Sequence, residues 1–70
     1  MLNEVLYMEA RLFREFCNMN NISPSHANDI FNKFQIWKYI ESCYDTLHTT
    51  GDEYILDDIQ NILAAKGAVI

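Results

Sequence analysis

Hydrophobic residues recur every three or four positions near the start of the chain, which is the spacing of one face of an α-helix. The residues of this stripe are Leu2, Val5, Leu6, Leu12, Phe13, Phe16 and Cys17. The spacing predicts a helix over residues 3–19 that buries these side chains. Several asparagines follow, and asparagine tolerates the left-handed backbone that often ends a helix.

A second helix is predicted over residues 24–34. Ser23 is well suited to cap the free amides of the first turn, and Pro24 suits the first helical position, where no backbone donor is missed. The apolar residues of this segment share one stripe and are Ala27, Ile30, Phe31 and Phe34.

A third helix is predicted over residues 36–48, from apolar residues in a 4-3-4 spacing. These residues are Ile36, Ile40, Cys43 and Leu47. No proline or glycine separates this segment from the preceding one. The second and third segments are therefore either two helices or one bent helix.

The last helix follows a turn at residues 49–52 and is expected to end at residue 66, with Gly67 as its C-terminal cap. Its start is ambiguous. Asp52 could cap a helix that begins at residue 53, or Asp57 could cap a later one, with Gln60 completing a capping box. The later start, at about residue 57, is slightly favoured.

Together these segments predict one all-α domain spanning residues 1–70, a compact bundle of three to four short helices. A domain of this size has a small core and often needs a partner subunit or very good helix packing. Nine aromatic residues supply large side chains for such packing. We expect some of them, including Tyr7, Tyr39 and Tyr54, to remain at the surface as contact residues.

The net charge of −5 is unevenly distributed. Residues 1–38 contain four acids and four bases, whereas residues 39–65 contain six acids and no lysine or arginine. Because nucleic-acid binding depends on Lys and Arg displacing counterions, the second half argues against a nucleic-acid partner. A protein with a basic surface is the expected partner.

The remaining composition indicates an intracellular protein. Cys17 and Cys43 lack a CxxC spacing and lie on apolar helix faces, which is typical of free thiols in a reducing compartment. Charged residues interrupt the first fifteen positions, and no apolar run reaches the roughly 20 residues of a membrane span. We therefore expect a cytoplasmic protein that does not contact a membrane.

Candidate chemistry is sparse. His48 lies three residues after Asp45 and close to Asp52, but no further ligand completes a metal shell. The pair Asp57 and Asp58 lacks the alternating oxygen ligands of a calcium loop, so we interpret it as part of a solvated acidic helix start. Phosphate loops and nucleophile elbows are absent from the sequence. No catalytic residue, cofactor or metal site is predicted, and we expect the protein not to be an enzyme.

Several short patterns are distributed along the chain: residues 43–59, Phe16–Cys17, Phe31–Phe34, Trp37–Ile40, and the leucine-histidine-x-x-glycine turn at Leu47–Gly51. Together these patterns resemble the small bacterial family called domain of unknown function 3791. The resemblance covers roughly residues 5–62, and the first helix departs from it by being less charged and richer in asparagine. Members tend to be encoded beside proteins similar to ADP-ribosyltransferase-like toxins, which implies an antitoxin, immunity or accessory binding role. Within the turn, we expect His48 and Asp52 to fix the backbone by hydrogen bonds.

The leading hypothesis is a small acidic protein-interaction module. Its predicted contact surface consists of Tyr7, Tyr39, Glu41, Asp45, His48, Asp52, Glu53, Tyr54, Asp57 and Asp58. The alternative is a small dimeric helix-turn-helix regulator built on residues 24–34 and 36–48, although the second of these offers few base-reading side chains. A homodimer is possible under both hypotheses.

Overall fold

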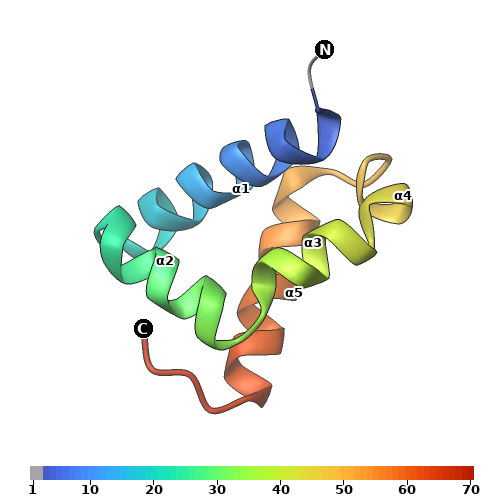
Figure 1. The fold of residues 1–70 in the computed structure, drawn as a ribbon. Helices are drawn as coiled ribbons and strands as arrows, with labels where there is room; N and C mark the ends of the chain where they lie inside the picture. Colours follow the sequence, from blue (N-terminus) through green and yellow to red (C-terminus); the bar gives the residue numbers. More distant parts are fainter. Residues whose placement is uncertain (1–2) are drawn as a thin grey trace.

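The computed structural model describes residues 3–70, and throughout this range the chain is helical or irregular, with no strand (Figure 1). Its helices are α1 (Glu4–Asn20), α2 (Pro24–Lys33), α3 (Ile36–Ser42), α4 (Tyr44–Leu47) and α5 (Asp52–Ala65). α1 packs against α2, α3 and α5. In Figure 1, α5 runs down behind α3 and crosses the direction of α1. The predicted all-α bundle is confirmed; Leu2, assigned to the first stripe, lies outside the described residues.

Both ends of α1 are fixed by asparagine. The Asn3 side-chain oxygen accepts hydrogen bonds from the backbone amides of Val5 and Leu6, which caps the first turn. Asn21 ends the helix in the left-handed conformation, with φ 54°. The predicted role of asparagine at this helix end is confirmed. The helix itself ends at Asn20, one residue beyond the predicted end at residue 19.

α2 begins as predicted. The Ser23 hydroxyl accepts a hydrogen bond from the amide of His26 at 3.1 Å, and Pro24 occupies the first turn. The helix ends at Lys33, and Gln35 then adopts a left-handed backbone with φ 59°. This single residue turns the chain without proline or glycine, so α2 and α3 are two helices and not one bent helix.

The third predicted helix, residues 36–48, is wrong as a continuous element. Cys43 has φ −105° and ψ 10°, outside ideal helical values, and divides the segment into α3 and the short α4. The hydrogen bonds continue across the break, since Cys43 donates to the Tyr39 carbonyl and accepts from the amides of Thr46 and Leu47. The irregularity divides the segment into two helices, and Leu47 in the second one is buried.

The favoured late start of the last helix is also wrong. α5 begins at Asp52, with Gly51 in extended backbone as its N-cap, and the Gly51 carbonyl accepts from the amides of Tyr54 and Ile55. Asp57 is therefore in the helix interior and caps nothing. The early start is explained by burial, because it brings Ile55 and Leu56 onto the same inward stripe as the later apolar residues.

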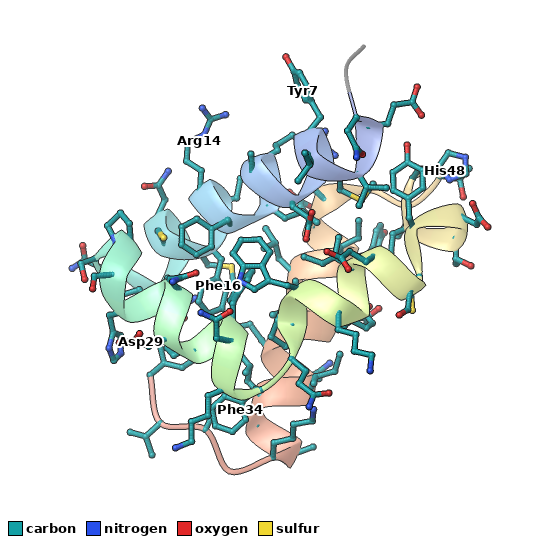
Figure 2. The ribbon with its side chains drawn as sticks, viewed as in Figure 1. Tyr7, Arg14, Phe16, Asp29, Phe34 and His48 are labelled. Carbon is teal, nitrogen blue, oxygen red and sulfur yellow. The ribbon has the colours of Figure 1, made fainter. Side chains whose placement is uncertain are left out.

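The core lies where the helices meet (Figure 2). Its fully buried large side chains are Phe16, Phe31, Leu12, Ile36, Ile40, Ile55, Ile59 and Leu63. Aromatic rings connect α1, α2 and α3: Phe16 and Phe13 both contact the edge or face of Phe31, and Phe13 stacks on Trp37 at 5.2 Å. Such ring pairs add to the stabilisation from area burial.

The buried face of α1 differs from the predicted one near its N-terminus. Leu6 was expected to be buried but is 62% exposed, whereas Met8 and Glu9 are buried. The face of α1 that contacts the core therefore contains Met8, Leu12 and Phe16, which are four residues apart, and Leu6 lies outside this face.

The C-terminal segment closes against the bundle. Gly67 has φ 76°, as expected of a capping glycine, and the amide of Ala68 donates to the Leu63 carbonyl at 2.9 Å. The Lys66 ammonium donates to the Phe34 carbonyl at the end of α2, at 3.1 Å. Beyond Ala68, Val69 is exposed.

Candidate functional site

An open hollow of about 480 Å3 lies between the first half of α1 and α4. It is lined by Glu4, Tyr7, Met8, Arg11, Tyr44 and His48. Figure 2 shows Tyr7 pointing outward from α1 and His48 at the α4 end of the molecule. Two residues of the predicted contact surface, Tyr7 and His48, therefore line the same hollow.

The side chains on the α4 side of the hollow hold one another in place. Tyr44 and His48, one helical turn apart, stack with ring centroids 5.2 Å apart and an interplanar angle of 15°. The Tyr44 hydroxyl donates to Oε2 of Glu4 at 2.9 Å, which connects α4 to the first turn of α1. This hydrogen bond, followed by desolvation and nearby carboxylates, raises the pKa of Tyr44.

Arg11 connects α1 to the start of α5. Its Nε and Nη2 atoms donate to the two carboxylate oxygens of Asp52 at 2.8 and 3.0 Å, a bidentate ion pair. The hydrogen bond from Arg11 lowers the pKa of Asp52. Glu15, one turn along α1, has a raised pKa because of desolvation and the nearby Asp52 carboxylate. Both carboxylate oxygens of Asp52 are thus engaged by Arg11.

The turn between α4 and α5 is fixed differently from the prediction. His48 Nδ1 lies 3.0 Å from the Tyr44 carbonyl oxygen, so the expected structural role of His48 is supported by a contact. Asp52 does not bond to this turn. The hydroxyls of Thr49 and Thr50 both donate to the Thr46 carbonyl instead, each at 3.0 Å.

The outer face of α5 carries four residues of the predicted contact surface. Glu53, Tyr54, Asp57 and Asp58 are all exposed, and the Tyr54 side chain is 70% accessible. Tyr54 precedes Asp57 by three residues and Asp58 by four, and Glu53 precedes Asp57 by four. Residues at these spacings are neighbours on a helix surface. We call these four residues the α5 face.

Tyr39 differs from the prediction of an exposed aromatic. It is half-buried and packs against the core, and burial followed by the nearby Asp58 carboxylate raises its pKa. Its position on α3 explains the difference, since the neighbouring residues Ile36 and Ile40 are fully buried. Asp45 is exposed on α4 as expected.

Glu41 lies apart from the other predicted acids, beside a buried glutamate of α1. Glu9 is only 6% exposed, and among the described residues it is the one charged side chain that is buried. Burial raises the pKa of Glu9, and the charge and hydrogen-bonding carboxyl of Glu41 raise it further. This pair of acids was not foreseen, because the residues are distant in sequence.

Of the ten predicted residues, four make up the α5 face and two line the hollow. Of the other four, Tyr39 lies near Asp58 of the α5 face, Asp45 is on α4, Asp52 is bonded to Arg11, and Glu41 adjoins Glu9. Three residues that shape the hollow, Glu4, Arg11 and Tyr44, were missed. Tyr44 belongs to the segment that carried the family resemblance, but nothing in the sequence pairs Arg11 with a residue 41 positions away.

The described residues contain neither a cluster of metal ligands nor a membrane-spanning helix. Between residues 3 and 70, no three or more His, Cys, Asp or Glu side chains are grouped as ligands for a metal ion. No helix in that range is both long enough and apolar enough to cross a membrane. Cys17 is a buried free thiol, and Cys43 is a half-buried one.

Comparison with known protein families gives a match that covers most of the chain. The family described as Protein of unknown function (DUF3791) matches residues 9–66. This range runs from the middle of α1 to the end of α5 and includes Arg11, Tyr44 and the whole α5 face. Comparison with curated proteins and with solved structures finds no match. The family match covers most of the chain, and the chain therefore belongs to the DUF3791 family.

Proposed function

We propose that the protein is a binding module for another protein with a basic surface, and that the α5 face is its principal contact. The observation that supports this most strongly is Tyr54, which is 70% exposed and lies beside Asp57 and Asp58 on a helix. A large exposed aromatic surrounded by one sign of charge is typical of a contact residue, since tyrosine is enriched among interface hot spots.

The charge of this region favours a basic partner. Residues 39–65 contain no lysine or arginine, and Arg11, which reaches this region from α1, is paired with Asp52. Within residues 3–70, the carboxylates of the α5 face therefore form no ion pair that would compete with a partner's basic groups. Such a surface steers a complementary partner toward it. A second copy would bring acids against acids at this face, so a homodimer would have to use another surface.

The alternative of a helix-turn-helix regulator receives no comparable support. The helix that would enter the major groove, α3, is seven residues long and exposes Lys38, Glu41 and Ser42. A recognition helix reads bases chiefly through Arg, Lys, Asn or Gln. We propose no catalytic or cofactor-dependent activity. An antitoxin or accessory role beside a toxin-like protein stays a prediction, as does a cytoplasmic location.

The proposal can be tested by capture of partners from the native cell, with two matched double variants as bait. Tyr54→Ser with Asp57→Asn removes the aromatic and one charge from the α5 face. Met19→Ser with Asp29→Asn makes a similar change at exposed positions of α1 and α2. We expect a partner that is retained by the wild type and by the second variant and lost by the first. If both variants lose or retain every partner equally, the α5 face is not the contact.

A further inference from the structure

We infer that the hollow between α1 and α4 receives an arginine side chain of the partner. This inference rests on the proposed function, because it names the chemical group by which a basic partner would be held. It concerns a different surface from the α5 face, however, and it can be tested separately.

The charges around the hollow favour a cation. The one base in its lining, Arg11, already donates two hydrogen bonds to Asp52, at 2.8 and 3.0 Å. With that pair neutralised, Glu4 is the uncompensated charge of the lining. An anionic guest would meet the Glu4 carboxylate and find the Arg11 guanidinium engaged. A cationic guest would meet the Glu4 carboxylate, which accepts a hydrogen bond from the Tyr44 hydroxyl.

The aromatic lining favours a guanidinium among cations. On the α1 side of the hollow, Tyr7 is 62% exposed. On the α4 side, the rings of Tyr44 and His48 lie nearly parallel to each other. A guanidinium is planar, stacks on aromatic faces and forks onto a carboxylate, whereas an ammonium is a compact and strongly hydrated point charge. The combination of rings and a carboxylate therefore matches arginine better than lysine.

The hydrogen bonds within the lining leave acceptors for such a guest. Glu4 is held through Oε2 by the Tyr44 hydroxyl, which positions the carboxylate before a guest arrives. His48 Nδ1 faces the Tyr44 carbonyl at 3.0 Å. A carbonyl only accepts, so Nδ1 bears the hydrogen, and in the neutral ring Nε2 is then an acceptor. Both groups thus suit a donor-rich guest.

The size of the hollow sets the scale of the guest. Its volume, about 480 Å3, lies at the lower end of ligand sites and admits one long side chain with water rather than a helix. The hollow lies beside the start of α5, because Arg11 in its lining is bonded to Asp52. A partner on the α5 face would therefore have the hollow within reach of its neighbouring side chains.

The experiment is an NMR titration of the full 70-residue chain, labelled with 15N, with N-acetyl-arginine methylamide as the probe. Its neutral, near-isosteric counterpart, N-acetyl-citrulline methylamide, is the control ligand. We expect saturable shifts in the amides of residues 4–11 and 44–48 with the arginine probe, and much smaller ones with citrulline. Loss of the carboxylate in Glu4→Gln should weaken arginine binding by about threefold, the size expected of an exposed ion pair.

Asp45→Asn is the matched control variant. It removes one exposed carboxylate from α4, next to Tyr44 but outside the lining. We expect its arginine affinity to stay closer to that of the wild type than the affinity of Glu4→Gln does. The same spectra report whether each variant is folded.

Several results would overturn the inference. These are equal shifts from the two probes, no saturable shift with arginine, equal weakening in the two variants, or shifts centred on the α5 face. None of them contradicts the proposed function, which depends on loss of a partner when Tyr54 and Asp57 are changed. Conversely, arginine binding in the hollow without a partner that needs the α5 face would contradict the proposed function alone.

Discussion

At the scale of single residues, Glu9 is a charged residue that the fold buries. Its side chain is 6% exposed on α1, and the carboxyl of Glu41 on α3 lies near it. Burial is the largest cause of its raised pKa, and Glu41 adds to it. A carboxyl whose pKa is higher in the folded than in the unfolded state stabilises the fold at low pH. This contribution is lost as the pH rises through the folded pKa.

Glu9→Gln should therefore stabilise the protein at neutral pH. We expect the free energy of unfolding to rise by about 1 kcal/mol at about pH 7, because a neutral amide avoids burial of a charge. The gain should shrink as the pH falls through the raised pKa of Glu9, where the native glutamate is itself neutral. Urea unfolding at several pH values measures both effects.

The control for this change is Glu53→Gln, which removes a carboxylate from an exposed position of α5. Its effect on stability should be within about 0.5 kcal/mol at every pH, as is usual for surface substitutions. A Glu9→Gln protein that is less stable than the wild type at neutral pH would show that the ionised carboxylate is favourably paired.

The sequence predicts residue environments only where the helical pattern is unbroken. Leu12, Phe16 and Cys17 are buried as expected. Leu6 and Glu9 depart from simple hydrophobicity in opposite directions, because the packing of α3 and α5 decides which part of α1 is covered. That packing depends on contacts between residues far apart in sequence, which periodicity does not contain.

At the scale of elements, the Arg11–Asp52 pair connects α1 to α5. Asp52→Asn should lower the free energy of unfolding by about 0.5–1 kcal/mol at neutral pH, since the pair is bidentate but partly exposed. The lowered pKa of Asp52 means that its contribution is present above the unfolded pKa. The contribution is lost as the pH falls through the folded pKa, opposite in direction to that of Glu9.

Stability of the wild type and Asp52→Asn, measured by urea unfolding across acidic and neutral pH, checks this sign. Asp57→Asn is the matched control, because the same substitution is made on the outer face of the same helix. Equal losses in the two variants would mean that the pair with Arg11 adds nothing specific. A gap that widens as the pH falls would contradict the sign.

The boundary between α2 and α3 gives another prediction at this scale. Gln35 has φ 59°, a left-handed conformation that costs a residue with a Cβ roughly 1–2 kcal/mol. Gln35→Gly should therefore stabilise the protein, by about 0.5–1 kcal/mol after the greater unfolded-state entropy of glycine is subtracted. Thermal unfolding or urea unfolding measures the change.

Asn21, with φ 54° at the end of α1, is the control position. Because asparagine tolerates this conformation, Asn21→Gly should gain less than Gln35→Gly does. The account of the α2–α3 boundary fails if Gln35→Gly is destabilising, or if Asn21→Gly gains as much or more.

Helix signals account for how well the elements were predicted. Ser23, Pro24 and Gly67 act where and as expected, because caps depend on neighbouring residues alone. The break at Cys43 was missed. The start of α5 at Asp52 lies one residue before the less favoured of the two predicted starts, because burial of residues further along the chain sets it. The predicted start at Asp57 relied on the capping preference of aspartate and neglected the burial of Ile55, which requires an earlier start.

At the scale of the whole molecule, the acidic second half divides into parts with different roles. Asp52 is bonded to Arg11, Glu41 adjoins Glu9, and the carboxylates at 53, 57 and 58 face solvent around Tyr54. The helical pattern predicted the fold class, and the distribution of charged residues predicted that the second half is acidic. They could not separate the engaged carboxylates from the free ones, because that requires the packing of α1 against α5.

The most direct measurement of the central claim is the affinity of a captured partner for the wild type and for Tyr54→Ser with Asp57→Asn. Both are measured at about 0.01 M and about 0.15 M salt. We expect the variant to bind at least about tenfold more weakly at the higher salt, as for an interface hot spot. The wild-type affinity should fall with salt more steeply than that of the variant. Equal affinities and equal salt dependence for the two proteins would contradict the claim that the α5 face binds a basic partner.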